Sequence, residues 1–283
     1  MNQDNHLNFM ILPTVCLNHN KLINMNIENY PIFTPLLNNI SQFKMKHFPN
    51  FITSLNLTSG FIAIIFAAHG NLVTASWLIL AAMIFDFLDG FSARLLKAYS
   101  AVGKELDSLA DVVSFGVAPG LIIYFLLNKA LSANTAININ SDILKAGLVM
   151  IIPAIMPVCG AIRLAIFNLD STQATTFKGL PIPANALAVI SLVIAQHYSQ
   201  SHLIDSVTGS PVFIVLFTIV LSLLMVSRFR LFSLKVANLK MKGNEGRYIL
   251  IGLVIVSLII FGWAGILLII PFYIVASAIS LLF

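Results

Sequence analysis

Four aspartates arranged in two pairs are the residues of this chain whose types and spacing could do chemistry. Asp86 and Asp89 are three residues apart, and Asp107 and Asp111 are four apart. On helices, both spacings place the two carboxylates on one face, about 5–6 Å apart between Cβ atoms. Two like charges ~6 Å apart repel by about 2–3 kcal/mol even at an effective dielectric of ~20. Four carboxylates on two facing helices would therefore need a cation among them.

A divalent metal ion is the natural counter-charge for such a group of acids. Residues 86–111 contain no Cys or His, and ligation by oxygen alone favours Mg²⁺, Mn²⁺ or Ca²⁺ over zinc. The small residues Gly90, Ala93 and Gly103 would let a bulky ligand approach the backbone. Arg94, one turn beyond Gly90, could neutralise phosphate oxygens.

The elements that must position this stretch are membrane helices. Of the 283 residues, 58% are hydrophobic and 10% charged, whereas soluble domains average about 25% charged residues. A bilayer core of ~30 Å requires roughly 20 apolar residues per helix, and eight candidate stretches occur. They are 51–69, 72–97, 107–128, 144–168, 184–199, 211–227, 248–263 and 265–282, the last two forming a hairpin. The predicted fold is an all-α polytopic membrane helix bundle.

The positive charges set the expected orientation. With the amino terminus in the cytoplasm, fourteen of the sixteen Lys and Arg residues fall on the cytoplasmic side, and only Lys129 and Lys145 fall outside. Cytoplasmic loops of membrane proteins carry such an excess, so the net charge of +5 is a topology signal and not a sign of nucleic-acid binding. Both termini and residues 86–111 are expected at the cytoplasmic face of a cell (inner) membrane.

Three regions are expected along the chain. Residues 1–44 are polar and rich in asparagine, which predicts a disordered cytoplasmic tail. Residues 45–230 would form the membrane domain that carries the four aspartates, and residues 231–283 a basic cytoplasmic loop followed by the hairpin. Cys16 and Cys159 are too few for a disulfide framework.

The acidic stretch also resembles a family signature. Residues 86–111 fit the pattern D-x2-D-G-x2-A-R-x8-G-x3-D-x3-D at all eight fixed positions, and in this they are similar to the CDP-alcohol phosphotransferases. Four flanking segments resemble the phosphatidylserine synthase subgroup: FPNFITSLN at 48–56, DSLADVVSFGVAP at 107–119, CGAIRLAIFN at 159–168 and FKGLPIP at 177–183. The resemblance covers roughly residues 49–185. It implies a six-helix core, with the C-terminal hairpin as an addition, and a homodimer.

The resemblance further implies a reaction and roles for individual residues. CDP-diacylglycerol would donate its phosphatidyl group to the hydroxyl of L-serine and release CMP, with Mg²⁺ or Mn²⁺, in a two-ion site, as cofactor. The metal ligands would be Asp86, Asp89, Asp107 and Asp111, and Asp111 would also act as general base. The residues expected to hold the CDP-lipid are Asn50, Thr53, Asp86, Gly90, Ala93, Arg94 and Gly103.

The acceptor site would depend on residues outside the signature. An arginine within a membrane helix faces a polar cavity or a partner, and its planar guanidinium suits a carboxylate. Arg163 is therefore the candidate ligand for the serine carboxylate, and Lys178 in the following loop is a second candidate. Alternatively, Arg163 is a structural partner of Asp170 or of a helix C-terminus.

Two other functions compete with this hypothesis. A relative that uses glycerol 3-phosphate or inositol phosphate would need further cations near the site, but between residues 110 and 184 only Arg163 and Lys178 are basic on the cytoplasmic side. A cation- or proton-coupled transporter would commonly show inverted repeats with broken helices near the bilayer midplane. The sequence has one acidic cluster and no second copy of it.

Overall fold

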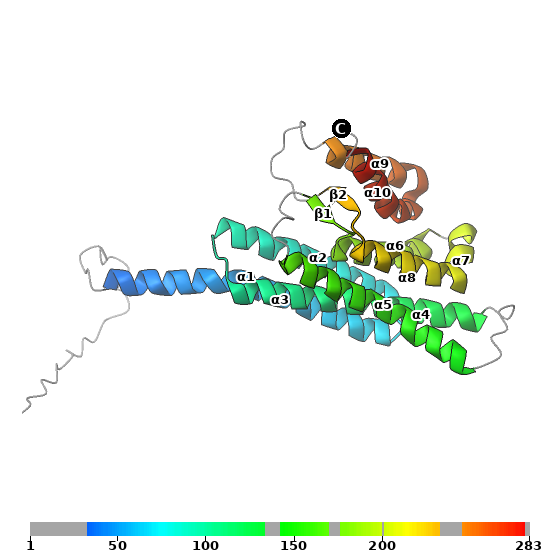
Figure 1. Cartoon of the computed structure of the whole chain (residues 1–283), viewed down its shortest axis with the longest axis horizontal. Helices are drawn as coiled ribbons and strands as arrows, with labels where there is room; N and C mark the ends of the chain where they lie inside the picture. Colours follow the sequence, from blue (N-terminus) through cyan, green and yellow to red (C-terminus); the bar gives the residue numbers. More distant parts are fainter. Residues whose placement is uncertain (1–32, 134–141, 170–175, 200, 233–244, 281–283) are drawn as a thin grey trace, which may run out of the picture. The chain divides into compact units, whose positions relative to one another are not determined.

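The computed structural model of the chain describes residues 33–133, 142–169, 176–199, 201–232 and 245–280. The chain divides into two compact units, Met1–Lys44 and Met45–Phe283, and the second unit carries all of the predicted site residues. The helices and strands are α1 (Phe33–Ala68), α2 (Leu72–Leu95), α3 (Ala101–Asp111), α4 (Ala118–Ala133), α5 (Asp142–Leu169), β1 (Thr176–Lys178), α6 (Ile182–Tyr198), α7 (His202–Thr208), α8 (Pro211–Val226), β2 (Arg230–Phe232), α9 (Glu245–Phe261) and α10 (Ile269–Ser280) (Figure 1). The helical class predicted from the sequence is confirmed, with one short pair of strands added.

A tight turn joins α1 to α2. Gly70 has a φ of 78°, a conformation that favours glycine. Asn71 caps α2, because its side chain accepts the backbone N–H of Thr74 at 3.1 Å. α1 begins at Phe33, so its first turns lie within residues 1–44. Residues 1–32 lie outside the described residues.

A continuous helical stretch carries the second pair of aspartates. Its parts are α3, a π-helical segment at Val112–Val117 and α4. Ser100 caps α3, because its Oγ accepts the N–H of Gly103 at 2.9 Å. The π-helical segment follows directly on Asp111, and such segments are rare and frequently lie at functional sites.

α5 packs closely against the π-helical segment and α4. A Cβ on Gly116 would lie 3.2 Å from Pro157 Cα, and a Cβ on Gly120 would lie 3.2 Å from Pro153 O. Small residues at such positions allow helix backbones to approach each other. Because both positions are glycine, α5 can pack closely against the helical stretch that follows α3.

A two-stranded antiparallel ribbon follows α5. Phe177 of β1 lies opposite Leu231 of β2. Gly179 has a φ of 79°, and a side chain on it would collide with carbonyl oxygens at the end of α8, among them Leu224 O at 3.1 Å. The backbone N–H of Leu180 donates to the same oxygen at 2.9 Å. The FKGLPIP segment thus contains the end of β1, a turn held against α8 and the start of α6.

Five helical stretches of the described chain are long and apolar enough to cross a membrane: His47–Ala68, Leu72–Leu95, Ala101–Ala133, Gly147–Leu169 and Tyr248–Ala278. The pair α7 and α8, bent by 73°, makes a sixth if it is taken as one span. The expected eight spans are not confirmed. Helices α6, α8, α9 and α10 have 17, 16, 17 and 12 residues, and at 1.5 Å per residue they reach about 18–26 Å, short of the ~30 Å bilayer core.

The last candidate span folds back on itself, since α9 and α10 pack against each other (Figure 1). Gly262, with a φ of 55°, begins a 3-10 segment that extends to Leu268. Ser257 Oγ of α9 donates to Gly265 O at 3.3 Å and fastens this turn. α10 also packs against β2 and α6.

Candidate active site

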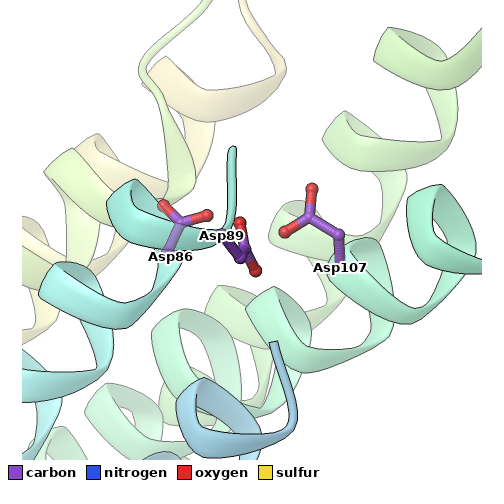
Figure 2. A group of neighbouring side chains, drawn as sticks. All are labelled: Asp86, Asp89 and Asp107. Carbon is purple, nitrogen blue, oxygen red and sulfur yellow. The ribbon is translucent and has the colours of Figure 1, made fainter. Parts of the chain in front are cut away.

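Three carboxylates from two helices form an acidic cluster, defined as Asp86, Asp89 and Asp107. Asp86 and Asp89 lie one turn apart on α2, and Asp107 points toward them from α3 (Figure 2). Each residue offers a carboxylate oxygen within 4.8 Å of those of the other two. Asp89 is 5% exposed, and the other two are half-buried. Asp86 and Asp89 thus share one face of α2, as their spacing predicts.

Asp111 lies beside the acidic cluster and has a different neighbour. It is the last residue of α3, is 7% exposed, and interacts electrostatically with all three members of the cluster. Asn56 of α1 donates from Nδ2 to Asp111 Oδ1 at 3.3 Å. The sequence predicts four metal ligands, whereas the structure groups three of them and gives the fourth an amide donor.

The donor set of the acidic cluster fits a hard divalent cation. All of the candidate ligand atoms are carboxylate oxygens, which Mg²⁺ and Ca²⁺ prefer. Asp89 Oδ2 is buried and makes no hydrogen bond to any part of the chain that the structure describes. A buried polar atom without a partner costs free energy, and a cation between the carboxylates would provide that partner.

Asn50 and Thr53 of α1 border the acidic cluster. A Cβ on Gly103 would lie 2.7 Å from Asn50 Oδ1, so glycine at this position of α3 leaves room for the Asn50 side chain. Thr53 lies within hydrogen-bonding reach of the Asp89 carboxylate, and its hydroxyl donates to Pro49 O at 3.1 Å. The structure therefore brings both predicted lipid-binding residues of α1 to the site.

Gly90, Ala93 and Arg94 lie on the last turns of α2. A Cβ on Gly90 would meet no atom within 4 Å, so there is open space beside the backbone next to Asp89. Ala93 is half-buried and Arg94 is exposed. Open space and an exposed cation at the edge of the acidic cluster would suit a large anionic ligand.

Arg163 lies buried on α5, with 7% of its surface exposed. Its guanidinium interacts electrostatically with Asp111 and with Tyr273 of α10. Its Nε makes no hydrogen bond among the residues described. The predicted acceptor ligand thus lies near the candidate base, while Asp170, its alternative partner, falls outside the described ranges.

Lys178, the second predicted acceptor ligand, is the last residue of β1. Its backbone lies opposite Arg230 of β2, and the following residue, Gly179, donates its N–H to Phe229 O at 2.8 Å. Since α10 packs against β2, Lys178 belongs to a ribbon that the C-terminal helix contacts. Its role in acceptor binding stays a prediction.

The sequence gives no direct indication of one polar network that fastens α5 to α3. Asn168 Nδ2 donates to Ser108 Oγ at 2.9 Å, and Lys104 Nζ donates to Asn168 O at 3.2 Å. Asn168 is the last residue of the CGAIRLAIFN segment, and the family resemblance assigns it no role. The network holds the end of α5 next to the helix that carries Asp107 and Asp111.

Two further residues near the site have no role in the sequence-based hypothesis. Asn56 could have been found, because Asn50, Thr53 and Asn56 recur every three residues along an apolar helix and so share one face. Tyr273 could not, because no local pattern distinguishes it from the other aromatic residues of the C-terminal region.

Apolar helices that carry an acidic cluster, a neighbouring buried acid and an exposed arginine are the features expected of a membrane-bound phosphotransferase. The chain belongs to the CDP-alcohol phosphatidyltransferase family, which matches residues 46–281, and it is a transferase of phospholipid biosynthesis. The match extends beyond residues 49–185, where the signature and its flanks lie, and includes the C-terminal hairpin.

Curated relatives carry related names. A CDP-diacylglycerol–serine O-phosphatidyltransferase of Helicobacter pylori is 36% identical over 214 residues, which cover 75% of this chain and 81% of the relative. The enzyme of the same name from Bacillus subtilis is 33% identical over 186 residues, covering 66% and 90%. An archaetidylserine synthase of Methanothermobacter thermautotrophicus is 34% identical over 154 residues, covering 54% and 60%. The name of each of these relatives includes serine.

Proposed function

We propose that the protein transfers the phosphatidyl group of CDP-diacylglycerol to the hydroxyl of L-serine, giving phosphatidylserine and CMP. The observation that best supports this proposal is the buried Arg163 near Asp111, which itself lies beside the acidic cluster. An arginine that can bind a carboxylate therefore lies near a carboxylate that can accept a proton. The second of these lies beside a candidate metal site. The names of the relatives point to the same acceptor.

The proposed step forms one bond and breaks one bond at the phosphatidyl phosphorus. The serine hydroxyl oxygen bonds to this phosphorus, and the bond from the phosphorus to the CMP oxygen breaks, with its electron pair leaving on CMP. Asp111 accepts the hydroxyl proton as general base. Asn56 orients the Asp111 carboxylate through its Nδ2–H, and Arg163 binds the serine carboxylate through its planar fork of N–H donors.

The donor would bind along α2 and the start of α1. The residues that would hold two Mg²⁺ or Mn²⁺ ions are Asp86, Asp89 and Asp107, with Asp111 beside them. When bound, the ions would neutralise charge on the diphosphate. Arg94 would bind diphosphate oxygens, the space beside Gly90 and Ala93 would admit the nucleotide, and Asn50 and Thr53 would contact it from α1.

The membrane arrangement that suits these substrates has eight spans, both termini in the cytoplasm and the site at the cytoplasmic face of the cell membrane. Fourteen of the sixteen basic residues then lie on the cytoplasmic side. At that position the cytidine head would reach the site from water while the acyl chains stay in the bilayer. A homodimer and a cell (inner) membrane location belong to the same proposal.

The test is CMP release by purified protein in detergent, with CDP-diacylglycerol and Mg²⁺ or Mn²⁺. L-serine is compared with glycerol 3-phosphate and inositol phosphate. We expect release that depends on serine and falls by about 10²–10⁴-fold in Asp111→Asn, the range typical of losing a general base. Asp205→Asn, a matched change at an exposed position of α7, should leave the rate unchanged. Release with another acceptor would reassign the substrate, and no release with any acceptor would favour a transport function.

A further inference from the structure

The connection between α2 and α3 has no role in the proposed reaction. It joins the stretches Leu72–Leu95 and Ala101–Ala133, each long and apolar enough to cross a membrane. Only residues 96–100 lie between them, and even an extended chain reaches at most about 3.3–3.6 Å per residue. The connection therefore lies at the boundary between the bilayer and water.

Hydrogen bonds at the end of α2 fix the conformation of this connection. The N–H of Ala98 donates to Ala93 O at 3.0 Å, and the N–H of Lys97 donates to Arg94 O at 3.3 Å. This pair of bonds is the Schellman motif, in which the residue with a positive φ is usually glycine. Here that residue is Lys97, with a φ of 50°, a conformation that costs an L-residue free energy. The backbone at this position thus favours glycine over the lysine that is present.

The side chains around Lys97 combine positive charge with apolar surface. Leu95 is 70% exposed, Tyr99 71% and Val102 72%. Lys97 is also exposed, and residues 90–104 contain no Asp or Glu. Tyrosine rings are enriched at membrane interfaces at the level of the headgroups, and basic residues next to a membrane helix attract anionic lipids. The connection therefore has the composition of a surface that contacts lipid headgroups.

We propose that the α2–α3 connection binds the headgroup of an anionic phospholipid, with Lys97 as the ligand for the lipid phosphate. Tyr99 lies at the level of the headgroups, while Leu95 and Val102 contact the upper part of the acyl chains. Binding of an anion accounts for a lysine at a position that favours glycine, because strained residues often serve a function. The inference depends neither on the identity of the acceptor nor on the side of the membrane that the connection faces.

The first test measures the melting temperature of the purified, full-length protein in a neutral detergent while phosphatidylglycerol or phosphatidylcholine is added. We expect phosphatidylglycerol to stabilise the wild type at lower mole fractions than phosphatidylcholine. Without lipid, Lys97→Gly should melt about 2–4 °C higher than the wild type, because the strain in the backbone is relieved. It should nevertheless need roughly fivefold more phosphatidylglycerol for a half-maximal shift, the effect of losing one cation near a lipid surface. Lys129→Gln, which removes an exposed cation from α4, should respond to the lipid like the wild type.

Lys97→Gln separates the charge from the backbone conformation, since it keeps a side chain at the strained position. It should weaken the response to phosphatidylglycerol without raising the melting temperature. Equal lipid requirements for Lys97→Gln and the wild type would overturn the inference, as would equal stabilisation by glycerol 3-phosphate, which has no acyl chains. A lower melting temperature for lipid-free Lys97→Gly would also overturn it, because the lysine would then serve to stabilise the C-terminus of α2.

A second test places a reporter at the connection. Trp77 and Trp263 are the two tryptophans of the chain, so Tyr99→Trp gives a single fluorophore once both are replaced by Phe. Brominated phosphatidylglycerol should quench it at lower mole fractions than brominated phosphatidylcholine, and Lys97→Gln should remove this difference. Leu203→Trp, at an exposed position of α7, is the matched control and should show no preference. Equal quenching of Tyr99→Trp by the two lipids would contradict the site. Neither test measures turnover, so a failure of the proposed function would leave both results unchanged.

Discussion

The four carboxylates of the site differ in their neighbours, and this difference separates their chemistry. A carboxylate that binds a cation holds a proton poorly, because the positive charge favours its ionised form. Asp86, Asp89 and Asp107 are near enough to share an ion. Asp111 lies outside that group and accepts a hydrogen bond from Asn56. This difference supports the proposal that Asp111 accepts the proton of the attacking hydroxyl.

Replacement of Asn56 tests whether this hydrogen bond matters to the reaction. Asn56→Ala removes the N–H that holds Asp111 Oδ1, and we expect kcat to fall roughly tenfold, since a hydrogen bond to a charged group is worth about 1.5–3 kcal/mol. Steady-state CMP release at saturating serine measures the effect. Thr58→Ala on the same helix is the control, because its hydroxyl is exposed and bonds only to Ser54 O in its own helix. A kcat equal to that of the control would show that Asn56 does not assist the base.

Removal of metal tests the acidic cluster. We expect a chelator to abolish CMP release and added Mg²⁺ or Mn²⁺ to restore it. Asp89→Asn should raise the metal concentration needed for half-maximal activity by at least about 10–100-fold, the scale found when a residue that only supports a metal ligand is lost. Titration of activity with the metal gives this value. Full activity in the presence of the chelator would contradict a metal role for the cluster, and the exposed Asp205→Asn should titrate like the wild type.

At the scale of elements, other helices hold the π-helical segment after Asp111 from two sides. Gly60 of α1 lies directly against Ser114, and Ser114 Oγ donates to Asn56 O at 3.1 Å. On the other side, Gly116 lies against α5. Contacts from two helices thus fix the irregular segment that sets the position of Asp111 relative to Asn56.

Gly60→Ala tests this packing. The new Cβ would lie 2.7 Å from the Ser114 backbone, so α1 and the π-helical segment must separate, and we expect a loss of stability of about 1–3 kcal/mol together with lower activity. Thermal unfolding in detergent measures the first effect. Gly252→Ala in α9 is the matched control, since a Cβ there meets nothing within 4 Å. Equal melting temperatures for the two variants would mean that α1 and the π-helical segment adapt without cost.

At the scale of the whole molecule, the sequence predicted those features that depend on local spacing. Asp86 and Asp89 share one face of α2 as expected, because helix geometry alone determines which side chains of a helix lie on the same face. The helical class followed from apolar composition. The roles assigned to the individual site residues stay predictions.

Features formed by residues far apart in the sequence could not be predicted. Asn56 and Asp111 are 55 positions apart, and no periodicity links Arg163 to Tyr273. The ribbon pairs two strands of only three residues each, too short to show alternation. The number of spans is not confirmed for a different reason: hydropathy detects apolar stretches, but several of them form helices shorter than the bilayer core.

The orientation in the membrane is the remaining large-scale prediction, and two single cysteines test it. In a background without Cys16 and Cys159, Tyr99→Cys reports on the connection between α2 and α3, and Asp205→Cys reports on α7; both positions are exposed. The excess of basic residues places the first in the cytoplasm and the second outside. A membrane-impermeant maleimide should therefore label Asp205→Cys in intact cells and Tyr99→Cys only after the membrane is opened. The opposite pattern would mean that the protein has the inverted orientation. Labelling of both positions from one side would mean that an even number of spans lies between them, where the proposed topology has three.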